Sequence, residues 1–497
     1  MPRARPAAPA VPAPLSAVDE TLAAFRKVFL SKPPFVSGVY PIDQTSYLLY
    51  YGGTGNPQCI DLANASESDL QALSDACQPA TFGRNDVDVY DESYRKAGKM
   101  DAGDFATKFD PEGSGLLDLI WPDFLSDGGD TKQRVVCELY KLNVYGQDSF
   151  FKAHKDTPRS DTMFGSLVIV FPTPHSGGAL VLRENNKEWT FDSAAEVLAG
   201  DAPRIGYVVF FSDVEHEVAR VTSGFRVTLT YNLYFNAKST TPANALLRQP
   251  DLPSRVSQVG KELRATLSSL LAREDFLPSG GYLGFGLRFM YPLDMKKPVA
   301  VIGDSLKGCD AMIKIVCDEL GLPNSLKAMY RSTSDVYDGV RVFVARDTFW
   351  KGTGPHQQID TEVGCPYETY TNKTSIVLRP AGAPPLTDYK RRVKPTEEVK
   401  WITEVPKDYN VVKSTYMAYG NEAQIEYAYG RPIIIARVGS FAERNGMARV
   451  ATTGPMTATG PTEAKDTQEG SGKAHTGPGE AVAGSGDTHA KPEKPET

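Results

Sequence analysis

The chain has 497 residues, enough for two or three domains of ordinary size. Hydrophobic residues make up 41% and charged residues 23%, proportions typical of a soluble globular protein with a substantial core. The formal charge of −7 gives no strong signal for nucleic-acid binding, because contacts to phosphate need a basic face. No stretch approaches the roughly 18 consecutive apolar residues of a membrane span, so we expect no membrane partner.

The N-terminus and the cysteines bear on where the protein works. Residues 1–17 are rich in Ala and Pro, lack the apolar stretch of a secretory signal, and are predicted to be disordered. The six cysteines are widely spaced and form no CxxC pair, which disfavours a disulfide framework or a zinc ribbon. These features predict a cytoplasmic or nuclear protein in a reducing compartment, which is compatible with ferrous iron.

Residues 18–133 are predicted to form a region of helices and loops that flanks the core. Hydrophobic residues recur at helical spacing over 19–30, and Ser66 is a suitable N-cap for a helix over 67–77. A short strand is expected at 47–51. The stretch 81–125 mixes polar and aromatic residues without a clear period, so we expect loops and short helices there.

Between residues 134 and 236 the pattern changes to short strand-like segments separated by turn formers such as Gly177-Gly178 and Asn185-Asn186. The segments cover residues 135–145, 165–171, 179–183, 188–191, 205–211, 217–221 and 225–235. Strands at such close spacing indicate a β-sandwich or barrel and not alternating βαβ units.

Residues 255–440 are predicted to form a second, α+β region, either a domain of its own or a completion of the first. Helices are expected over 255–272 and 304–320, the second ended by Gly321 and Pro323. Strands are expected at residues 282–290, 340–345 and 433–438. From residue 442 aromatic residues are absent, and residues 442–497 are predicted to be a disordered tail.

The sequence HKD places two metal-binding side chains two residues apart. On a strand, residues i and i+2 point to the same side, so His154 and Asp156 project together while Lys155 points away. His216, which follows the strand-like segment 205–211, is the best candidate for a third ligand. Two histidines and one carboxylate form a facial triad that leaves positions open, as oxygen-activating non-haem Fe(II) sites require.

The other histidines have simpler interpretations. His175 lies among Pro and Gly and is interpreted as a turn residue, His356 as a surface or structural residue, and His475 and His489 fall in the predicted tail. An isolated HxD motif is weak evidence, because it occurs by chance in many proteins. The all-β setting, the order of the candidate ligands and a later arginine favour the metal site over a chance pairing.

That arginine is Arg226, which Phe225 and Val227 flank in a strand-like segment expected to be buried. A buried arginine needs an anionic partner, and its planar guanidinium suits a carboxylate. The partner is either an acidic side chain in a structural ion pair or a small dicarboxylate whose other end lies on the metal. Thr228 shares the strand face of Arg226 and is expected to face the same cavity.

Three segments resemble the 2-oxoglutarate/Fe(II)-dependent dioxygenase superfamily, in its prolyl 4-hydroxylase-like branch. They read LYKLNVYGQDSFFKAHKDTPR, MFGSLVIVFPTPHSGGALVLR and VVFFSDVEHEVARVTSGFRVTLTYNLY. The resemblance is close from about Thr81 to Tyr234 and weaker elsewhere. It implies a double-stranded β-helix, or jelly roll, at residues 134–236 with flanking helices. With the C-terminal α+β region and the disordered termini predicted above, the expected fold class is α+β.

The resemblance also implies a role for each candidate residue. Arg226 would bind the far carboxylate of 2-oxoglutarate and Thr228 would add a hydroxyl. Tyr145, on the strand before HKD, would assist Arg226, with Tyr140 the weaker choice. No catalytic residue is implied beyond the metal ligands, which would be His154, Asp156 and His216.

The implied reaction couples oxidative decarboxylation of 2-oxoglutarate, giving succinate and CO2, to hydroxylation of a substrate by O2. The leading hypothesis is a hydroxylase of a protein or peptide side chain, with proline as one candidate. The alternatives are a dioxygenase of a small molecule or modified base, and a catalytically silent binding protein on the same fold. The cofactors implied are Fe(II), 2-oxoglutarate as co-substrate and ascorbate as an optional reductant.

Overall fold

The computed structural model describes residues 16–84, 87–125, 135–235, 258–293, 297–331, 343–348, 375–383, 396–405 and 428–445. Residues 1–448 group into one compact unit. The two segments predicted to be disordered lie outside the described residues except at their inner ends, where Ser16 caps the first helix and residues 441–445 form a helical turn. Disorder of these segments and the predicted domain boundaries therefore stay predictions.

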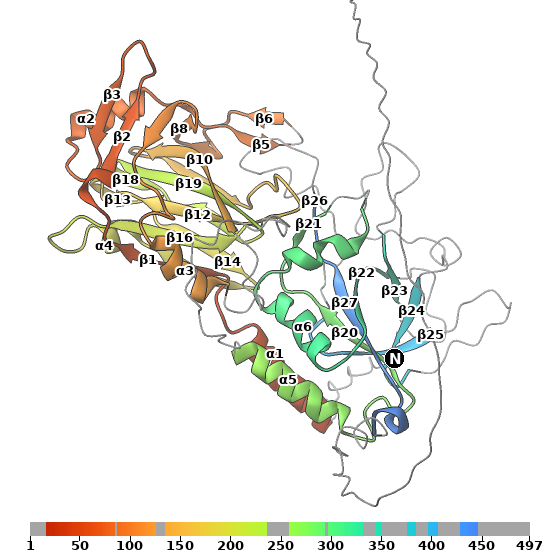
Figure 1. Cartoon of the computed structure of the whole chain (residues 1–497). Helices are drawn as coiled ribbons and strands as arrows, with labels where there is room; N and C mark the ends of the chain where they lie inside the picture. The colour runs from red at the N-terminus through yellow and green to blue at the C-terminus, as the bar shows by residue number, and fades with distance from the viewer. Residues whose placement is uncertain are drawn as a thin grey trace, which may run out of the picture. The chain divides into compact units, whose positions relative to one another are not determined.

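A seven-stranded antiparallel sheet is the largest element of the N-terminal part, and most of its strands run side by side in Figure 1. Its order is β1 (Phe35–Tyr40), β16 (Ile205–Phe211), β12 (Met163–Val170), β19 (Arg226–Phe235), β10 (Val135–Tyr145), β8 (Gly98–Asp101) and β4 (Gln78–Pro79). All seven residues of β16 are buried. A strand covered on both faces reads as a continuous apolar run, which is why the sequence predicted its bounds.

A second, five-stranded sheet carries the HKD motif. Its order is β15 (Lys187–Phe191), β14 (Leu180–Glu184), β17 (Glu215–Val218), β11 (Phe150–His154) and β7 (Arg95–Lys96). From β10 onward the chain passes repeatedly between the two sheets, although β14 and β15 follow each other within the second sheet. Strands β13 (His175–Gly177) and β18 (Val221–Gly224) form a separate two-stranded sheet. The repeated passage between the sheets brings β11 and β17, which are distant in sequence, to adjacent positions.

Short helices and a small sheet complete the N-terminal part. The helices are α1 (Ala17–Phe29), α2 (Glu67–Asp75), α3 (Leu116–Phe124), α4 (Ser193–Val197) and the 3-10 helix η1 (Gln44–Tyr47). Ser66 caps α2 in a reciprocal capping box with Asp69, as its position before the helix predicted. The small sheet holds β2 (Leu48–Tyr51), β3 (Gln58–Asp61) and β9 (Phe105–Thr107), and β5 (Phe82–Arg84) pairs with β6 (Val87–Val89).

The structure differs from the prediction for residues 18–133, which hold strands as well as helices and loops. Within the stretch 81–125, β7 and β8 extend the edges of the two main sheets, and β1 pairs with β16 at another edge. Strands of two to four residues, such as β7 and β8, show no period of two, so pattern reading misses them.

The C-terminal part combines helices with a closed barrel, which agrees with the predicted α+β class. Its helices are α5 (Gln258–Leu271), η2 (Val299–Ser305) and α6 (Gly308–Glu319). The barrel order is β20 (Gly281–Gly286), β25 (Thr396–Trp401), β24 (Ile376–Pro380), β23 (Phe343–Arg346), β22 (Asn324–Arg331) and β27 (Ile433–Val438), and β21 (Tyr291–Leu293) pairs with β26 (Ala428–Gly430). Among the described residues, no helix is both long and apolar enough to cross a bilayer.

A buried polar network joins this part to the second sheet. Lys307 donates from Nζ to Oδ1 of Asp213 at 2.6 Å and to the carbonyl oxygen of Met290 at 2.7 Å. The other carboxylate oxygen of Asp213 accepts from the backbone N–H of Met290 at 2.7 Å. Both charges are thus paired and hydrogen-bonded away from water, as a buried ion pair requires. Since Asp213 lies just before β17, the network holds the loop that leads to His216.

Candidate metal centre

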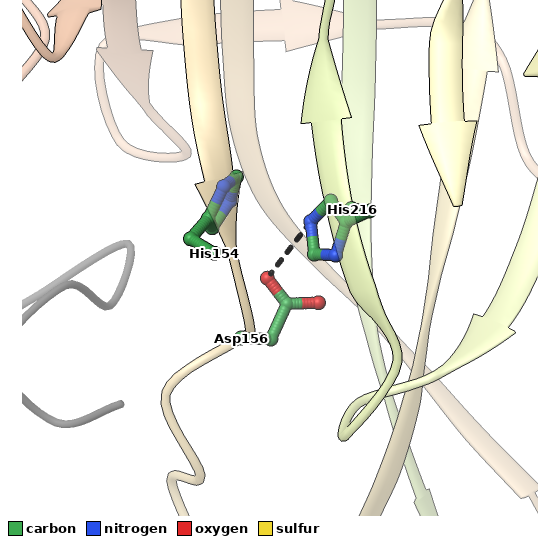
Figure 2. A group of neighbouring side chains, drawn as sticks. All are labelled: His154, Asp156 and His216. Atoms are coloured by element: carbon green, nitrogen blue, oxygen red, sulfur yellow. Dashed lines mark ion pairs between the residues drawn. The ribbon is translucent and has the colours of Figure 1, made fainter. Parts of the chain in front are cut away.

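The three predicted ligands meet between β11 and β17 (Figure 2). His154 ends β11, Asp156 follows it by two residues, and His216 lies on β17 directly opposite His154 in the antiparallel register. All three are buried, and their ligand atoms lie within 4.8 Å of one another. Nε2 of His216 is 3.8 Å from Oδ1 of Asp156, the pair that the dashed line in Figure 2 joins.

Backbone hydrogen bonds fix the direction of both imidazoles. Nδ1 of His154 lies 2.8 Å from the carbonyl oxygen of Lys152, and Nδ1 of His216 lies 3.0 Å from that of Val214. A carbonyl oxygen only accepts, so each Nδ1 carries the proton and each Nε2 keeps its lone pair for a metal. Burial, followed by the neighbouring His216, lowers the pKa of His154 well below its ordinary value and favours the neutral, metal-binding form.

The donor set fits Fe(II). Ser166 donates to Oδ2 of Asp156 at 2.5 Å, which fixes the carboxylate while Oδ1 faces His216. Two imidazole nitrogens and one carboxylate oxygen on one side of an ion leave its other coordination positions for a co-substrate and O2. Ser166, on β12, was not among the residues predicted from the sequence.

The cluster borders a cavity that the predicted co-substrate residues share. Arg226, Tyr145 and Thr228 line this cavity, as does Tyr140. Tyr145 pairs with Arg226 across β10 and β19, so the two residues project to the same side of the sheet. The structure therefore brings together all six residues that the sequence assigned to iron and co-substrate.

Arg226 is fully buried without a carboxylate partner in the described part of the chain. Its Nε donates to the hydroxyl of Ser193 at 3.3 Å, and its Nη2 is buried with no hydrogen-bond partner there. Burial lowers the pKa of Arg226 to about 10, which still leaves it charged near neutral pH. Gly178, at a φ of +72°, makes room for it, because a Cβ at this position would lie 2.8 Å from Cδ of Arg226. The structural ion pair that the sequence left open is thus absent among these residues.

His175 and Ser193 support the arginine, and pattern reading missed both. His175 is buried on β13, with Nδ1 2.7 Å from the carbonyl oxygen of Thr173 and Nε2 3.0 Å from the hydroxyl of Ser193. Its interpretation as a turn residue is wrong, because a three-residue strand beside Pro and Gly has no readable period. The remaining histidines, His356, His475 and His489, lie outside the described residues.

Lys141 is a further buried cation at this cavity. Its side chain is 3% exposed, and its ion pair with Asp101 spans 3.8 Å. Burial, followed by the nearby charges of Lys99 and Arg95, lowers the pKa of Lys141 to about 7. An ordinary lysine titrates at 10.5, so between about pH 7 and 10.5 the folded chain binds fewer protons than the unfolded chain.

We predict that Lys141→Met stabilises the protein in a pH-dependent manner. The buried charge of Lys141 lowers the free energy of unfolding by its full amount below about pH 7. This cost disappears as the pH rises toward 10.5, the pKa of lysine in the unfolded chain. The free energy of unfolding should therefore rise by about 1–3 kcal/mol at about pH 6, with a smaller gain at about pH 9.5. Urea denaturation at the two pH values measures this, and an equal gain at both would contradict it.

Comparisons with known proteins address the same segment. Residues 140–234 match the family model of the 2OG-Fe(II) oxygenase superfamily. No curated protein matches the chain. Among solved structures, a prolyl-4-hydroxylase of Pseudomonas putida is similar at 18% identity over 44% of this chain and 100% of that one, with a TM-score of 0.26.

Two further solved structures are similar at the same level. An oxidoreductase of the 2OG-Fe(II) oxygenase family from Burkholderia pseudomallei shares 15% identity over 46% of this chain and 96% of its own, with a TM-score of 0.21. The other is a prolyl hydroxylase of Trichoplax adhaerens, solved with a peptide fragment of the hypoxia inducible factor oxygen degradation domain. It shares 16% sequence identity over 44% of this chain and 92% of its own, with a TM-score of 0.25. The match of residues 140–234 spans both candidate ligand segments and Arg226, so this part of the chain is similar to the 2OG-Fe(II) oxygenase superfamily, a class of oxidoreductases.

Proposed function

We propose that the protein is an Fe(II)- and 2-oxoglutarate-dependent dioxygenase that hydroxylates a side chain of a protein or peptide, with proline as the first candidate. The observation that carries the proposal is Arg226, a buried guanidinium without a carboxylate partner among the described residues. It lines the same cavity as the two histidines and Asp156. A dicarboxylate with one end on the metal and the other on Arg226 satisfies both groups.

The two sheets support a double-stranded β-helix as the fold of this domain. Apart from the hairpin of β14 and β15, the chain passes repeatedly between the sheets from β10 to β19, and every pairing among these strands is antiparallel. The metal ligands come from β11, the turn after it, and β17, while the arginine comes from β19. In this arrangement the site lies between the sheets, where neighbouring strands fix each side chain.

Each residue has a distinct task in this reaction. His154, Asp156 and His216 would hold Fe(II), which when bound supplies the chemistry of O2. Arg226 and Thr228 bind and orient the distal carboxylate of 2-oxoglutarate, and Tyr145 lies beside the arginine, whose guanidinium carbon is 5.5 Å from the centre of the tyrosine ring. Apolar residues of the lining exclude water around these polar groups: Val168, Leu180, Phe210 and Val218.

The balanced reaction consumes one 2-oxoglutarate and one O2 for each substrate C–H bond converted to C–OH. One oxygen atom enters succinate, formed as CO2 leaves, and the other enters the substrate. Ascorbate would serve to return oxidised iron to Fe(II). The resemblance of the HKD and VEH segments to the prolyl 4-hydroxylase-like branch supports a peptide substrate, whereas a small molecule or a modified base is the competing outcome.

The test is turnover by the purified full chain. Protein loaded with Fe(II) is mixed with 2-oxoglutarate, ascorbate, O2 and a pool of proline-containing peptides, and both succinate and peptide masses are followed. We expect succinate together with peptides heavier by one oxygen atom. Succinate without oxidised peptides would move the substrate to the small-molecule class. Absence of both products, in protein that has bound iron, would favour a silent binding protein.

A further inference from the structure

The cavity holds more positive charge than the metal and the co-substrate account for. Arg95, Lys141 and Arg226 line it, whereas Asp156 is the one acidic residue among its described lining. Fe(II) and Arg226 bring three positive charges, which the carboxylate of Asp156 and the two carboxylates of 2-oxoglutarate balance. Lys141 has Asp101 as an acidic neighbour outside the cavity lining, whereas the charge of Arg95 falls outside this balance.

Arg95 is a buried arginine whose hydrogen-bond acceptors are neutral. It is 4% exposed. Its Nη1 donates to the carbonyl oxygen of Thr81 at 2.7 Å and its Nη2 to Oδ1 of Asn143 at 2.9 Å. Nε is buried with no hydrogen-bond partner, and no Asp or Glu in the described part of the chain forms an ion pair with this side chain. A desolvated cation without an anion is costly, so the site is complete only with a negatively charged ligand.

Arg95 lies beside the metal centre. Its guanidinium carbon is 4.3 Å from the centre of the Phe151 ring, and that ring stacks on His154 with 3.6 Å between centroids. In the sheet, Arg95 of β7 pairs directly with Phe151 of β11. Arg226 reaches the same cavity from β19. An anion held by Arg95 therefore lies close to the position where the substrate is oxidised and is separate from the end held by Arg226.

Two neighbours add donors to this side of the cavity. The hydroxyl group of Tyr140 is buried beside the Arg159 guanidinium, which can only donate to its oxygen, so the O–H of Tyr140 is left as a donor. The ammonium of Lys141 is 4.5 Å from the centre of the Tyr140 ring, and both residues line the cavity. A guanidinium N–H, a phenol O–H and an ammonium group are all donors, and together they match the acceptors of a carboxylate.

We propose that Arg95 binds a carboxylate of the primary substrate, so that the enzyme selects acidic substrates. The inference rests on the proposed dioxygenase function and adds the charge of the substrate to it. The carboxylate belongs either to an acidic side chain within a peptide or to a small free acid. Both present the same chemistry to Arg95, and matched probes distinguish them.

The experiment is calorimetric titration of the full chain, loaded with Fe(II) and 2-oxoglutarate without O2, with pairs of probes that differ in one carboxylate. N-acetyl-aspartate α-amide against N-acetyl-asparagine α-amide represents the acidic side chain. N-acetylproline against N-acetylprolinamide represents the small free acid. In at least one pair, the carboxylate probe should bind about ten- to hundredfold more tightly than its amide, the range for a charge-assisted hydrogen bond. The pair that shows the difference identifies the source.

Variants assign the preference to Arg95. In Arg95→Gln the ratio of the two affinities should fall to about one, because the amide keeps hydrogen-bonding groups and loses the charge. Lys96→Gln removes the same charge one residue along β7 from a half-buried side chain outside the cavity, so it should keep the preference. Arg95→Lys keeps the charge without the planar fork, should retain part of the preference, and provides a second variant if Arg95→Gln does not fold.

Three results separate this inference from the proposed function. Equal binding of carboxylate and amide probes in both pairs by the unaltered protein would overturn the role of Arg95, whatever the variants do. A raised KM for 2-oxoglutarate in Arg95→Gln, with the probe ratio unchanged, would place Arg95 in the co-substrate site instead. Absence of succinate in the presence of O2 would refute the dioxygenase reaction, while the titrations, which need no turnover, would still report on Arg95.

Discussion

Replacement of Asp156 by Ala should remove Fe(II) from the protein. The variant leaves two imidazoles and no anionic ligand, and Ser166 loses the carboxylate that accepts its hydrogen bond. Even loss of an outer partner of a ligand weakens metal binding by about 10- to 100-fold, so loss of a ligand should weaken it by at least about 100-fold. Metal analysis after anaerobic loading and desalting measures the occupancy, and succinate formation should fall with it.

Asp161→Asn is the matched control. Asp161 lies a few residues after the HKD motif but is partly exposed and pairs with Lys297 at 2.7 Å, away from the cavity lining. This variant loses one carboxylate, as Asp156→Ala does, and should keep one Fe(II) per chain. Retention of stoichiometric iron by Asp156→Ala would refute the ligand assignment. Similar melting temperatures of the two metal-free variants would show that the difference lies in the metal site and not in folding.

The ligand set was accessible to sequence reasoning because it depends on local geometry. The spacing of His154 and Asp156 places both on one side of an extended chain, and the structure confirms that they face His216. Strands β10, β16 and β27 begin and end at the predicted residues, since each is rich in β-branched and aromatic residues. The spacing of residues in the sequence does not predict the pairing of β11 with β17, which places His216 opposite His154.

Residues that depend on tertiary pairing escaped the prediction. Arg95 lies on a two-residue strand that exists only because β11 offers it an edge, and nothing in its neighbourhood marks it as buried. Ser193 likewise gains its importance from its hydrogen bond with Arg226, which comes later in the chain, and His175 from its contact with Ser193. In the C-terminal barrel, the parallel pairing of β20 with β25 joins segments far apart in sequence, beyond the range of any local pattern.

Replacement of Arg226 by Gln should raise the KM for 2-oxoglutarate by at least about 30-fold. Truncating one partner of a buried, hydrogen-bonded charge pair costs about 2–5 kcal/mol, and 2 kcal/mol corresponds to that factor. Initial rates of succinate formation over a range of 2-oxoglutarate concentrations measure it. Iron occupancy should be unchanged, because Arg226 is not a ligand. Arg226→Lys keeps the charge and should lose less affinity than Gln, whereas an unchanged KM in Arg226→Gln would remove the arginine from the co-substrate site.

Stability measurements on Arg226→Met distinguish a binding arginine from a structural one. If Arg226 served mainly to stabilise the fold, the variant would melt at a lower temperature. The described residues instead show a buried guanidinium with a hydroxyl acceptor and no carboxylate, and burial lowers its pKa to about 10. The uncompensated charge should therefore destabilise the protein without co-substrate, and Arg226→Met should melt at a higher temperature. Added 2-oxoglutarate should raise the melting temperature of the Fe(II)-loaded parent protein more than that of the variant, because the ligand supplies the missing anion only where the arginine is present.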